Sequence, residues 1–307
     1  MKTLDFEWKI LQWFDSFKCD FLNLFNQYVS LIFGSIGLIV ILMVVYWICN
    51  KEKGYIIAYN LFLAIILNNI LKTFFMRRRP FEHTGYEHLR KLDVAKDGAT
   101  GSSFPSGHAM NSSCLYSSLT LNFKAKRFLW LQIVCIVLII LIAISRLYLG
   151  VHFFTDVVCG VVLGILITIL FTFIQKVLAG KKNILYIITI ILFLPCLFFD
   201  IFARDFYKGY GLMIGFMIAN LLEARFVKFD INVTGTQKLI RLLIGAIVVG
   251  SIYLVYEVVP SSVHNNLYFT LFIHFLLSFC GFFVVPLIFK FIEKPHKKAY
   301  KNTTSKN

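Results

Sequence analysis

Two histidines stand beside residue types that bind phosphate, in segments far apart along the chain. The stretch SSFPSGHAMNSS places Ser106 and Gly107 directly before His108, and the stretch SRLYLGVHFFTD contains both Arg146 and His152. An imidazole can exchange protons with a bound group near neutral pH, or attack that group as a nucleophile. The two segments together predict chemistry on an anion that both histidines can reach.

The PSGH stretch is typical of a helix start. Ser102 or Ser103 can cap the helix, and Pro105 suits its first turn. The N–H groups of that turn lack partners within the helix, Gly107 leaves them uncovered and Ser106 adds a hydroxyl, so we expect an anion site there. The alternative interpretation is a helix cap with an incidental histidine.

His152 and Asp156 are spaced i and i+4, which places them on one face of a helix. The Asp156 carboxylate can then accept the Nδ1–H of His152, fix the tautomer and leave Nε2 free as a nucleophile. An isolated pair of this kind is more often a simple hydrogen bond at a helix start. Its meaning therefore depends on the neighbouring segments.

The segment KTFFMRRRP supplies cations. Lys72 and Arg79 are two helical turns apart, and we expect both on one face of a helix that Pro80 ends. Lys72 could instead extend its ammonium group to the membrane surface. For Arg77 and Arg78 we expect only a basic collar at that surface.

The elements that carry these segments are typical of a membrane protein. The sequence is 58% hydrophobic and its mean hydropathy is +0.75, beyond the range of soluble globular domains. Apolar runs long enough to cross a bilayer predict nine spans. We expect them near residues 29–49, 55–75, 105–122, 128–146, 153–174, 184–203, 210–228, 239–259 and 267–291. The seventh carries Glu223 and Arg225, so it could be an interfacial or bundle-buried helix instead of a plain membrane span.

Residues 1–28 show apolar side chains at helical spacing with charged ones among them, which predicts a helix lying on the membrane surface. Acidic residues in this segment interrupt the apolar run that a cleaved leader would need, so we expect none. The seven cysteines lack metal-ligand spacing and are expected to be reduced packing residues. We therefore expect an all-α polytopic membrane bundle with a six-span core over 29–204, about three further spans over 205–292, and a basic tail over 293–307.

The net charge of +15 is distributed by loop, which fits a membrane better than a nucleic-acid partner. Apart from the cations near the three segments, most of the 31 Lys and Arg residues fall on the side of the tail. The positive-inside rule then places the tail in the cytoplasm and the amino terminus outside. The three segments meet at the outer face, where fixed cations would stabilise a phosphate; acidic ligands for magnesium are lacking, so we expect no metal and no cofactor.

Together, the three segments resemble the three-part signature of the type-2 phosphatidic acid phosphatase superfamily, which is shared with vanadium-dependent haloperoxidases. Every signature position is matched in order. The resemblance implies a membrane phosphatase that works through a phosphohistidine without a metal. It implies that His152 is the nucleophile, Asp156 its orienting partner and His108 the general acid. The phosphate-binding residues that it implies are Lys72, Arg79, Ser106, Gly107 and Arg146.

A site at the bilayer surface favours a phosphate carried on a lipid, and the composition favours a bacterial cell membrane. Undecaprenyl diphosphate is the first candidate, and phosphatidate and phosphatidylglycerophosphate are the alternatives. A lipid-linked phosphotransferase could use the same phosphohistidine. A transporter is disfavoured because its polar residues should follow a path through the bilayer, and a haloperoxidase because such enzymes are soluble.

Overall fold

The computed structural model describes residues 4–86, 101–124, 126–199 and 201–293, and within these ranges every regular element is a helix. Seven helices there are long and apolar enough to cross a membrane. Two shorter helical stretches occupy the other positions at which spans are expected: α6 (Gly107–Asn122), and α9 (Lys182–Phe193) with its extension η6 (Leu194–Phe198). The predicted all-α membrane bundle is confirmed, and the protein is an integral membrane protein.

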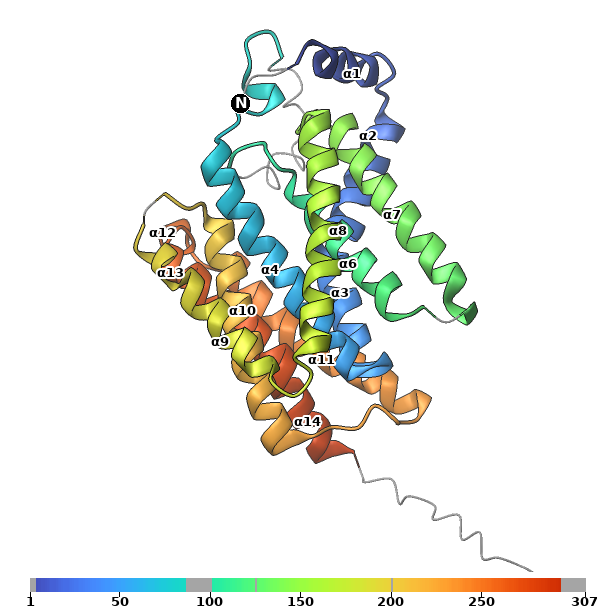
Figure 1. The fold of residues 1–307 in the computed structure, drawn as a ribbon, viewed down its shortest axis with the longest axis vertical. Coiled ribbons are helices and arrows are strands. Elements are labelled where there is room, and N and C mark those ends of the chain that lie inside the picture. The colour runs from blue at the N-terminus through green and yellow to red at the C-terminus, as the bar shows by residue number, and fades with distance from the viewer. Residues whose placement is uncertain (1–3, 87–100, 125, 200, 294–307) are drawn as a thin grey trace, which may run out of the picture.

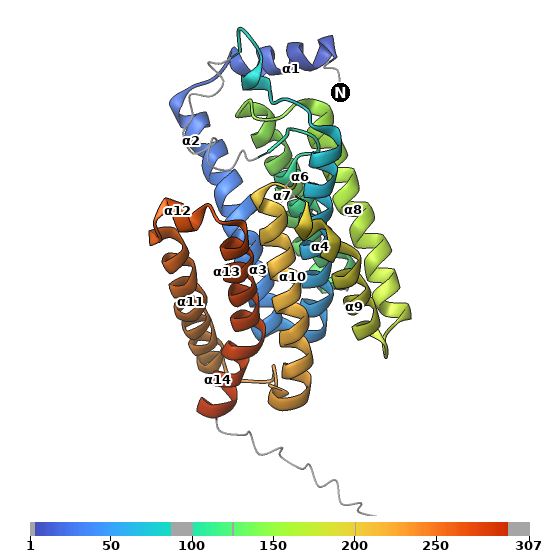
Figure 2. The same cartoon turned by 90° about the vertical axis from the view of Figure 1, so that its left-hand side faces the viewer.

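The first span begins earlier than the sequence indicated. A continuous helical run joins α2 (Asp20–Tyr28), the π-helical segment η1 (Val29–Ile36), α3 (Gly37–Val44) and the π-helical segment η2 (Val45–Cys49). Only α1 (Asp5–Asp15) lies across the end of the bundle (Figures 1 and 2). Part of the segment that was predicted to lie on the surface therefore belongs to the span.

Helix α4 (Lys51–Phe75) lies at the centre of the bundle, and more than three quarters of its most apolar stretch is buried inside the protein. It packs against α6, α8 (Phe154–Val177) and α10 (Arg204–Leu222), while α7 (Leu129–Tyr148) covers the outer side of α6 (Figure 1). Helices α6 and α8 approach closely, because a β-carbon on Gly164 would lie only 2.3 Å from the carbonyl oxygen of Met110. The three sequence segments lie at one end of this group, where α4 and α7 end and where α6 and α8 begin.

The carboxyl-terminal helices form a second group: α11 (Gly235–Val258), α12 (Ser261–His264), α13 (Leu267–Phe279), the π-helical segment η8 (Cys280–Val284) and α14 (Val285–Ile292). Helix α10 and its continuation η7 (Glu223–Val227) lie between this group and α4 (Figure 2). Glu223 is completely buried and accepts hydrogen bonds from Lys51 Nζ (2.7 Å) and Tyr55 OH (2.8 Å). The seventh expected span is one of the seven described helices that are long and apolar enough to cross a membrane, and half of its most apolar stretch is buried in the bundle.

Hydrogen bonds join the first span to the last span at the end of the bundle opposite α1. Trp47 Nε1 donates to the carbonyl of Gly281 (2.9 Å), and Tyr46 OH donates to the carbonyl of Phe282 (3.0 Å). Arg241, fully buried on α11, donates to the carbonyl of Trp47 (2.9 Å). From residue 294 onward, the predicted basic tail lies outside the described residues.

Candidate active site

Arg79 is held by backbone carbonyls, although helix α4 ends before it. The helix ends at Phe75, and Met76 has a left-handed backbone with φ 41° and ψ 41°. Arg79 is extended, with φ −77° and ψ 158°, as is usual before a proline. The prediction that it continues the helix of Lys72 is therefore wrong, because the left-handed residue turns the chain. Its guanidinium donates from Nε to Gly101 O and from Nη1 to Val151 O, each at 3.0 Å.

Helix α6 begins later than predicted. Its first residue is Gly107 and its N-cap residue is Ser106, so Ser102 and Ser103 do not cap it and Pro105 precedes it. The prediction that Ser102 or Ser103 caps the helix is wrong, because both serines are engaged elsewhere: Ser102 Oγ donates to a carbonyl of α4, and Ser103 Oγ donates to a carboxylate of α8. The hydroxyl of Ser106 makes no capping hydrogen bond and stays available for another partner.

The start of α6 lies close against α4. Asn68 Nδ2 donates to the carbonyl of Pro105 (3.2 Å), and a β-carbon on Gly107 would lie 3.0 Å from Asn68 Oδ1. A larger residue at this position would crowd Asn68 and require its side chain to shift by a few tenths of an ångström. Gly107 therefore allows the close approach that places the first turn of α6 beside the end of α4.

His152 precedes helix α8 instead of lying in it. The helix starts at Phe154, and Asp156 folds back so that its Oδ2 accepts from the backbone N–H of Phe153 (2.9 Å). His152 Nδ1 lies 3.7 Å from this oxygen, while Ser103 Oγ donates to it at 2.5 Å and lies 3.4 Å from Nδ1. The predicted pair is brought together, but Ser103 bridges it and no direct hydrogen bond forms.

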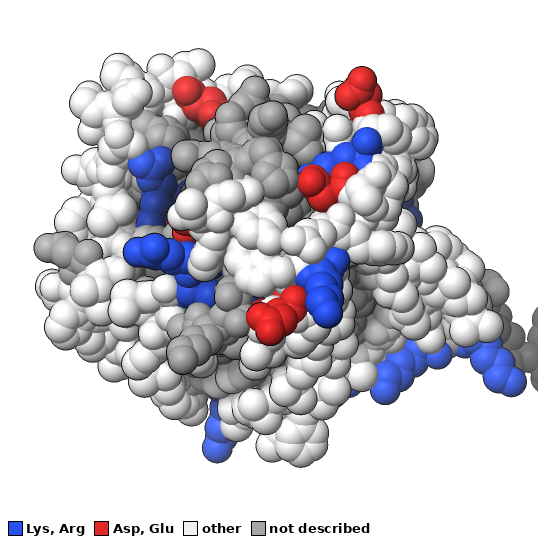
Figure 3. All heavy atoms as spheres, turned by 90° about the horizontal axis from the view of Figure 1, so that it is seen from above, with Lys and Arg blue, Asp and Glu red and all other residues white. Residues whose placement is uncertain are grey.

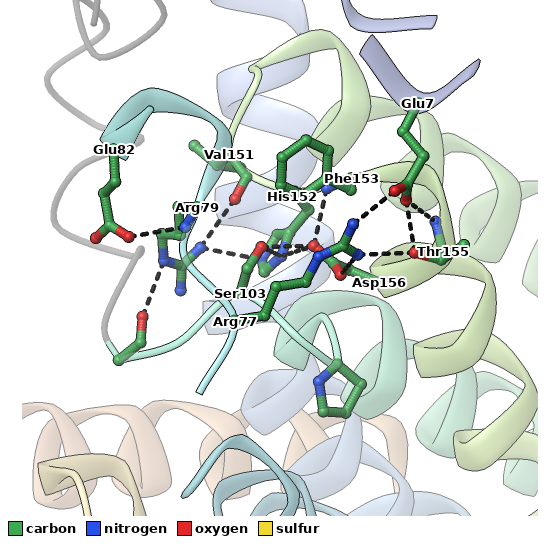
Figure 4. Close-up of polar contacts among 12 residues, drawn as sticks. Glu7, Arg77, Arg79, Glu82, Ser103, Val151, His152, Phe153, Thr155 and Asp156 are labelled. Carbon is green, nitrogen blue, oxygen red and sulfur yellow. Dashed lines mark hydrogen bonds and ion pairs between the residues drawn. The ribbon is translucent and has the colours of Figure 1, made fainter. Parts of the chain in front are cut away.

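Nε2 of His152 faces a cluster of cations. It lies 3.3 Å from Nη1 of Arg79 (Figure 4), and Lys72 and Arg146 also interact electrostatically with the ring. Burial, and then Arg79, Arg146 and Lys72, hold the pKa of His152 well below its usual value. The imidazole is therefore neutral near neutral pH, and its Nε2 lone pair accepts the hydrogen bond from Nη1 of Arg79.

Ser106 and Arg146 carry buried donors that have no hydrogen-bond partner among the described residues. These donors are Oγ of Ser106 and both Nε and Nη2 of Arg146. Ser106 is fully buried and Arg146 is 2% exposed, so water does not readily solvate them. A buried polar group left unpaired costs about 1–3 kcal/mol, and more when it is charged. These are the groups that an anion could bind.

The first span contributes two serines that the sequence analysis missed. Ser35 Oγ lies 2.9 Å from Nε2 of His108, and Ser30 Oγ accepts a hydrogen bond from Nη1 of Arg146. Both serines belong to η1, where π-helical winding brings residues five apart close to the same side. An α-helical reading would place Ser30 and Ser35 on different faces, which is why the pattern gave no signal.

Arg77 is not the surface collar that the sequence predicted. It is 2% exposed, and its guanidinium donates to Oε2 of Glu7 (2.6 Å) and to Oδ1 of Asp156 (2.5 Å) (Figure 4). It also stacks over the ring of Phe153, 4.2 Å from the centroid. The prediction failed because two buried carboxylates, one from a distant part of the chain, draw this arginine inward.

The eight predicted site residues come from the adjoining ends of α4, α6, α7 and α8, at the end of the bundle that α1 crosses (Figure 1). They are Lys72, Arg79, Ser106, Gly107, His108, Arg146, His152 and Asp156. Seen from that end, acidic and basic side chains are interspersed on the surface (Figure 3). The visible surface at this end therefore carries charges of both signs and is not a uniform basic face.

These features define a polytopic helical membrane protein with histidines and cations gathered at one end. Comparison with known proteins identifies the group: residues 53–178 match the PAP2 superfamily, and residues 207–297 match the transmembrane extension of PAP2 superfamily phosphatases. The chain belongs to the PAP2 superfamily. The resemblance seen in the sequence is thereby confirmed.

Two curated relatives and one solved structure illustrate the similarity. Phosphatidylglycerophosphatase B of Bacillus subtilis is 38% identical over 108 residues, which are 33% of this chain and 48% of the relative. Undecaprenyl-diphosphatase of Sulfolobus acidocaldarius is 30% identical over 133 residues, 43% of this chain and 60% of the relative. The chain thus spans about half the length of the curated relatives that it matches. The crystal structure of a transmembrane PAP2 type phosphatidylglycerolphosphate phosphatase from Bacillus subtilis aligns with 27% identity and a TM-score of 0.44, covering 55% of this chain and 84% of the other.

Proposed function

We propose that the protein is a metal-independent membrane phosphatase that hydrolyses a lipid phosphate or diphosphate through a phosphohistidine on Nε2 of His152. In this proposal, Lys72, Arg79 and Arg146 hold the phosphate. His108 is the general acid and base, and Asp156 supports the charged form of the nucleophile.

The observation that carries the proposal is the set of buried donors without protein partners beside the lone pair of His152. Ser106 Oγ and two nitrogens of Arg146 have no hydrogen-bond partner among the described residues, and Arg79 lies 3.3 Å from Nε2. Phosphate oxygens would satisfy these donors and gain charge-assisted hydrogen bonds. The same donors would stabilise the charge that spreads over the equatorial oxygens during transfer.

The proposed reaction has two steps. Nε2 of His152 attacks phosphorus while the bond to the leaving oxygen breaks, and His108 gives that oxygen a proton. Water then attacks the phosphohistidine, His108 takes its proton, and phosphate leaves. As the imidazole becomes positive in the first step, the Ser103–Asp156 arrangement at Nδ1 stabilises it.

We propose a lipid as the substrate, with undecaprenyl diphosphate first and phosphatidate or phosphatidylglycerophosphate next. The names of the two curated relatives, a phosphatidylglycerophosphatase and an undecaprenyl-diphosphatase, support the lipid class but favour no single member. We further propose that the site end faces the extracytoplasmic side of a bacterial cell membrane and that the carboxyl end is cytoplasmic, from the loop charges.

The test is phosphate release by the purified protein in detergent, with EDTA present, over a panel of lipid and soluble phosphates. We expect hydrolysis of at least one lipid phosphate, inhibition by vanadate, and loss of turnover in His152→Ala. A requirement for added magnesium, or full activity of His152→Ala, would contradict the proposal. Labelled lipid supplied with lipid or sugar acceptors separates hydrolysis from phosphotransfer, because only the latter moves the label to an acceptor.

A further inference from the structure

Helix α1 is joined to the candidate site by a chain of buried charges. Glu7 on α1 accepts from Arg77 Nη2 at 2.6 Å, and Arg77 Nη1 donates to Asp156 Oδ1 at 2.5 Å. All three residues are at most 2% exposed. Thr155 adds a second link, since its hydroxyl and its backbone N–H both donate to Oε1 of Glu7.

The two oxygens of Asp156 have different partners. Oδ2 accepts hydrogen bonds from Ser103 Oγ and from the backbone N–H of Phe153, and it lies 3.7 Å from Nδ1 of His152. Oδ1 accepts from Arg77. Because the guanidinium is planar and bound at both ends, it fixes the rotation of the Asp156 carboxylate. The orientation of Oδ2 toward His152 therefore depends on Arg77.

The charge of Glu7 matters as much as its position. Arg77 alone would neutralise Asp156 and weaken its effect on the imidazolium-like state of His152. Glu7 restores a net charge of −1 to the group formed by Glu7, Arg77 and Asp156. Although burial opposes it, hydrogen bonds from Thr155, the backbone N–H of Leu4 and Arg77 lower the pKa of Glu7, so this carboxylate is ionised.

Helix α1 also has an exposed aromatic side. Phe6 and Trp13 on α1 are exposed, while Leu11 and Phe14 on the other side are buried. Aromatic side chains of this kind favour the headgroup layer of a membrane. Figure 2 shows the helix that carries Glu7 lying across the end of the bundle, where such an aromatic side could contact the headgroup layer.

We propose that Glu7 is a positioning residue that acts through Arg77 to orient Asp156 and to raise the basicity of His152, so that the docking of α1 completes the site. The inference rests on the proposed function. His152 is also faced by other charged groups. These are Lys72 at the end of α4, Arg79 in the segment after it, Arg146 of α7 and His108 of α6, with Glu82 and Asp205 acting on Arg79.

The experiment measures the pH dependence of kcat/KM, whose acid limb reports protonation of His152 in the free enzyme. Glu7→Gln removes one negative charge, which disfavours the imidazolium, so the acid limb should move down by about one pH unit. At neutral pH kcat should fall about tenfold while KM changes less than about twofold. The reason is that the negative charge of Glu7 in the wild-type protein stabilises the phosphorylated imidazole more than it stabilises the bound substrate. The control Asp5→Asn, an exposed carboxylate on the same helix, should leave both quantities unchanged.

A second pair of variants tests charge separately from folding. Arg77→Met leaves two carboxylates unopposed, so the acid limb should move up. Adding Glu7→Gln to Arg77→Met restores the net charge of −1, so the limb should return to its wild-type position. If neither Glu7→Gln nor its addition to Arg77→Met moves the limb, while His152→Ala abolishes turnover, the inference fails and the proposed function stands. If His152→Ala is fully active, the proposed function itself fails.

Discussion

His152 and His108 reach the same cations from different helices, but their contacts differ in kind. His152 has Ser103 and Asp156 at Nδ1 and Arg79 at Nε2, which suits the role of nucleophile that we propose for it. His108 has only the hydroxyl of Ser35 at Nε2 among its hydrogen-bond contacts in the described residues. An imidazole without a carboxylate partner is better suited to giving and taking a proton.

This difference predicts a dependence on the leaving group. In His108→Ala, p-nitrophenyl phosphate should still phosphorylate His152, because its phenolate leaves with little help from a proton, whereas an alkyl lipid phosphate should not. The phosphohistidine formed should then hydrolyse slowly, because water lacks its base. Rapid-quench measurement of phosphoenzyme on both substrates checks this. Equal impairment on good and poor leaving groups would mean that His108 only helps to bind phosphate.

Ser35 should affect the proton-transfer step and not binding. Ser35→Ala removes the hydroxyl 2.9 Å from His108 Nε2, and we expect kcat on an alkyl phosphate to fall about three- to tenfold with KM nearly unchanged. The effect should be smaller with p-nitrophenyl phosphate. Ser251→Ala, an exposed serine on α11, is the matched control. A rise in KM alone would place Ser35 in substrate binding instead.

The sequence singled out eight residues that the structure places at one end of the bundle, but it missed side chains that contact them. The types and spacing of the eight follow a local pattern that can be read along the chain. Glu7 and Arg77 were missed because a charge pair between distant segments leaves no local pattern. One signal was present: Glu7 shares the helical face of Leu11 and Phe14, and a carboxylate on an apolar face requires a buried partner.

At the scale of elements, hydropathy located the helices but not their internal geometry. A run of apolar residues predicts a span whether it winds as an α-helix or a π-helix. The π-helical turns of η1 could therefore not be predicted from hydropathy. The same limit applies to α6, which is only 16 residues long and polar along much of its length. Its place in the bundle follows from close packing on α8, which depends on small residues and not on hydropathy.

That packing gives a prediction about stability. A β-carbon on Gly164 would lie 2.3 Å from the carbonyl oxygen of Met110 and 3.0 Å from the backbone nitrogen of Cys114. Gly164→Ala should therefore push α8 away from α6 and cost about 1–3 kcal/mol of unfolding free energy, with a parallel loss of activity. Thermal unfolding in detergent provides the measurement. Gly250→Ala on α11, where a β-carbon meets nothing within 4 Å, should be tolerated; equal loss in both variants would contradict the packing argument.

On the scale of the whole molecule, buried ion pairs join the core to the carboxyl-terminal helices. Glu223 is completely buried and binds Lys51, Tyr55 and the backbone N–H of Phe229. Glu223→Ala should lower the Tm by about 5 °C, because these donors lose a charged acceptor. The kcat/KM of the folded fraction should not change, since Glu223 lies at the end away from the site.

Glu52 provides the control for this effect. Its side chain is 69% exposed, and it pairs with Lys182 only at 3.5 Å. Glu52→Ala should shift the Tm by less than about 1 °C, as exposed pairs contribute little. A similar Tm shift in both variants would show that burial at Glu223 is not what holds the two groups of helices together.

The hydrogen bonds from Trp47 and Tyr46 to the carbonyls of Gly281 and Phe282 bear on how the protein is made. The first span leaves the ribosome long before residues 281 and 282 are synthesised. Until then, its indole N–H and phenol lack these partners in an environment that penalises unpaired polar groups. These two hydrogen bonds therefore form only after the helix that carries Gly281 and Phe282 has inserted beside the first span.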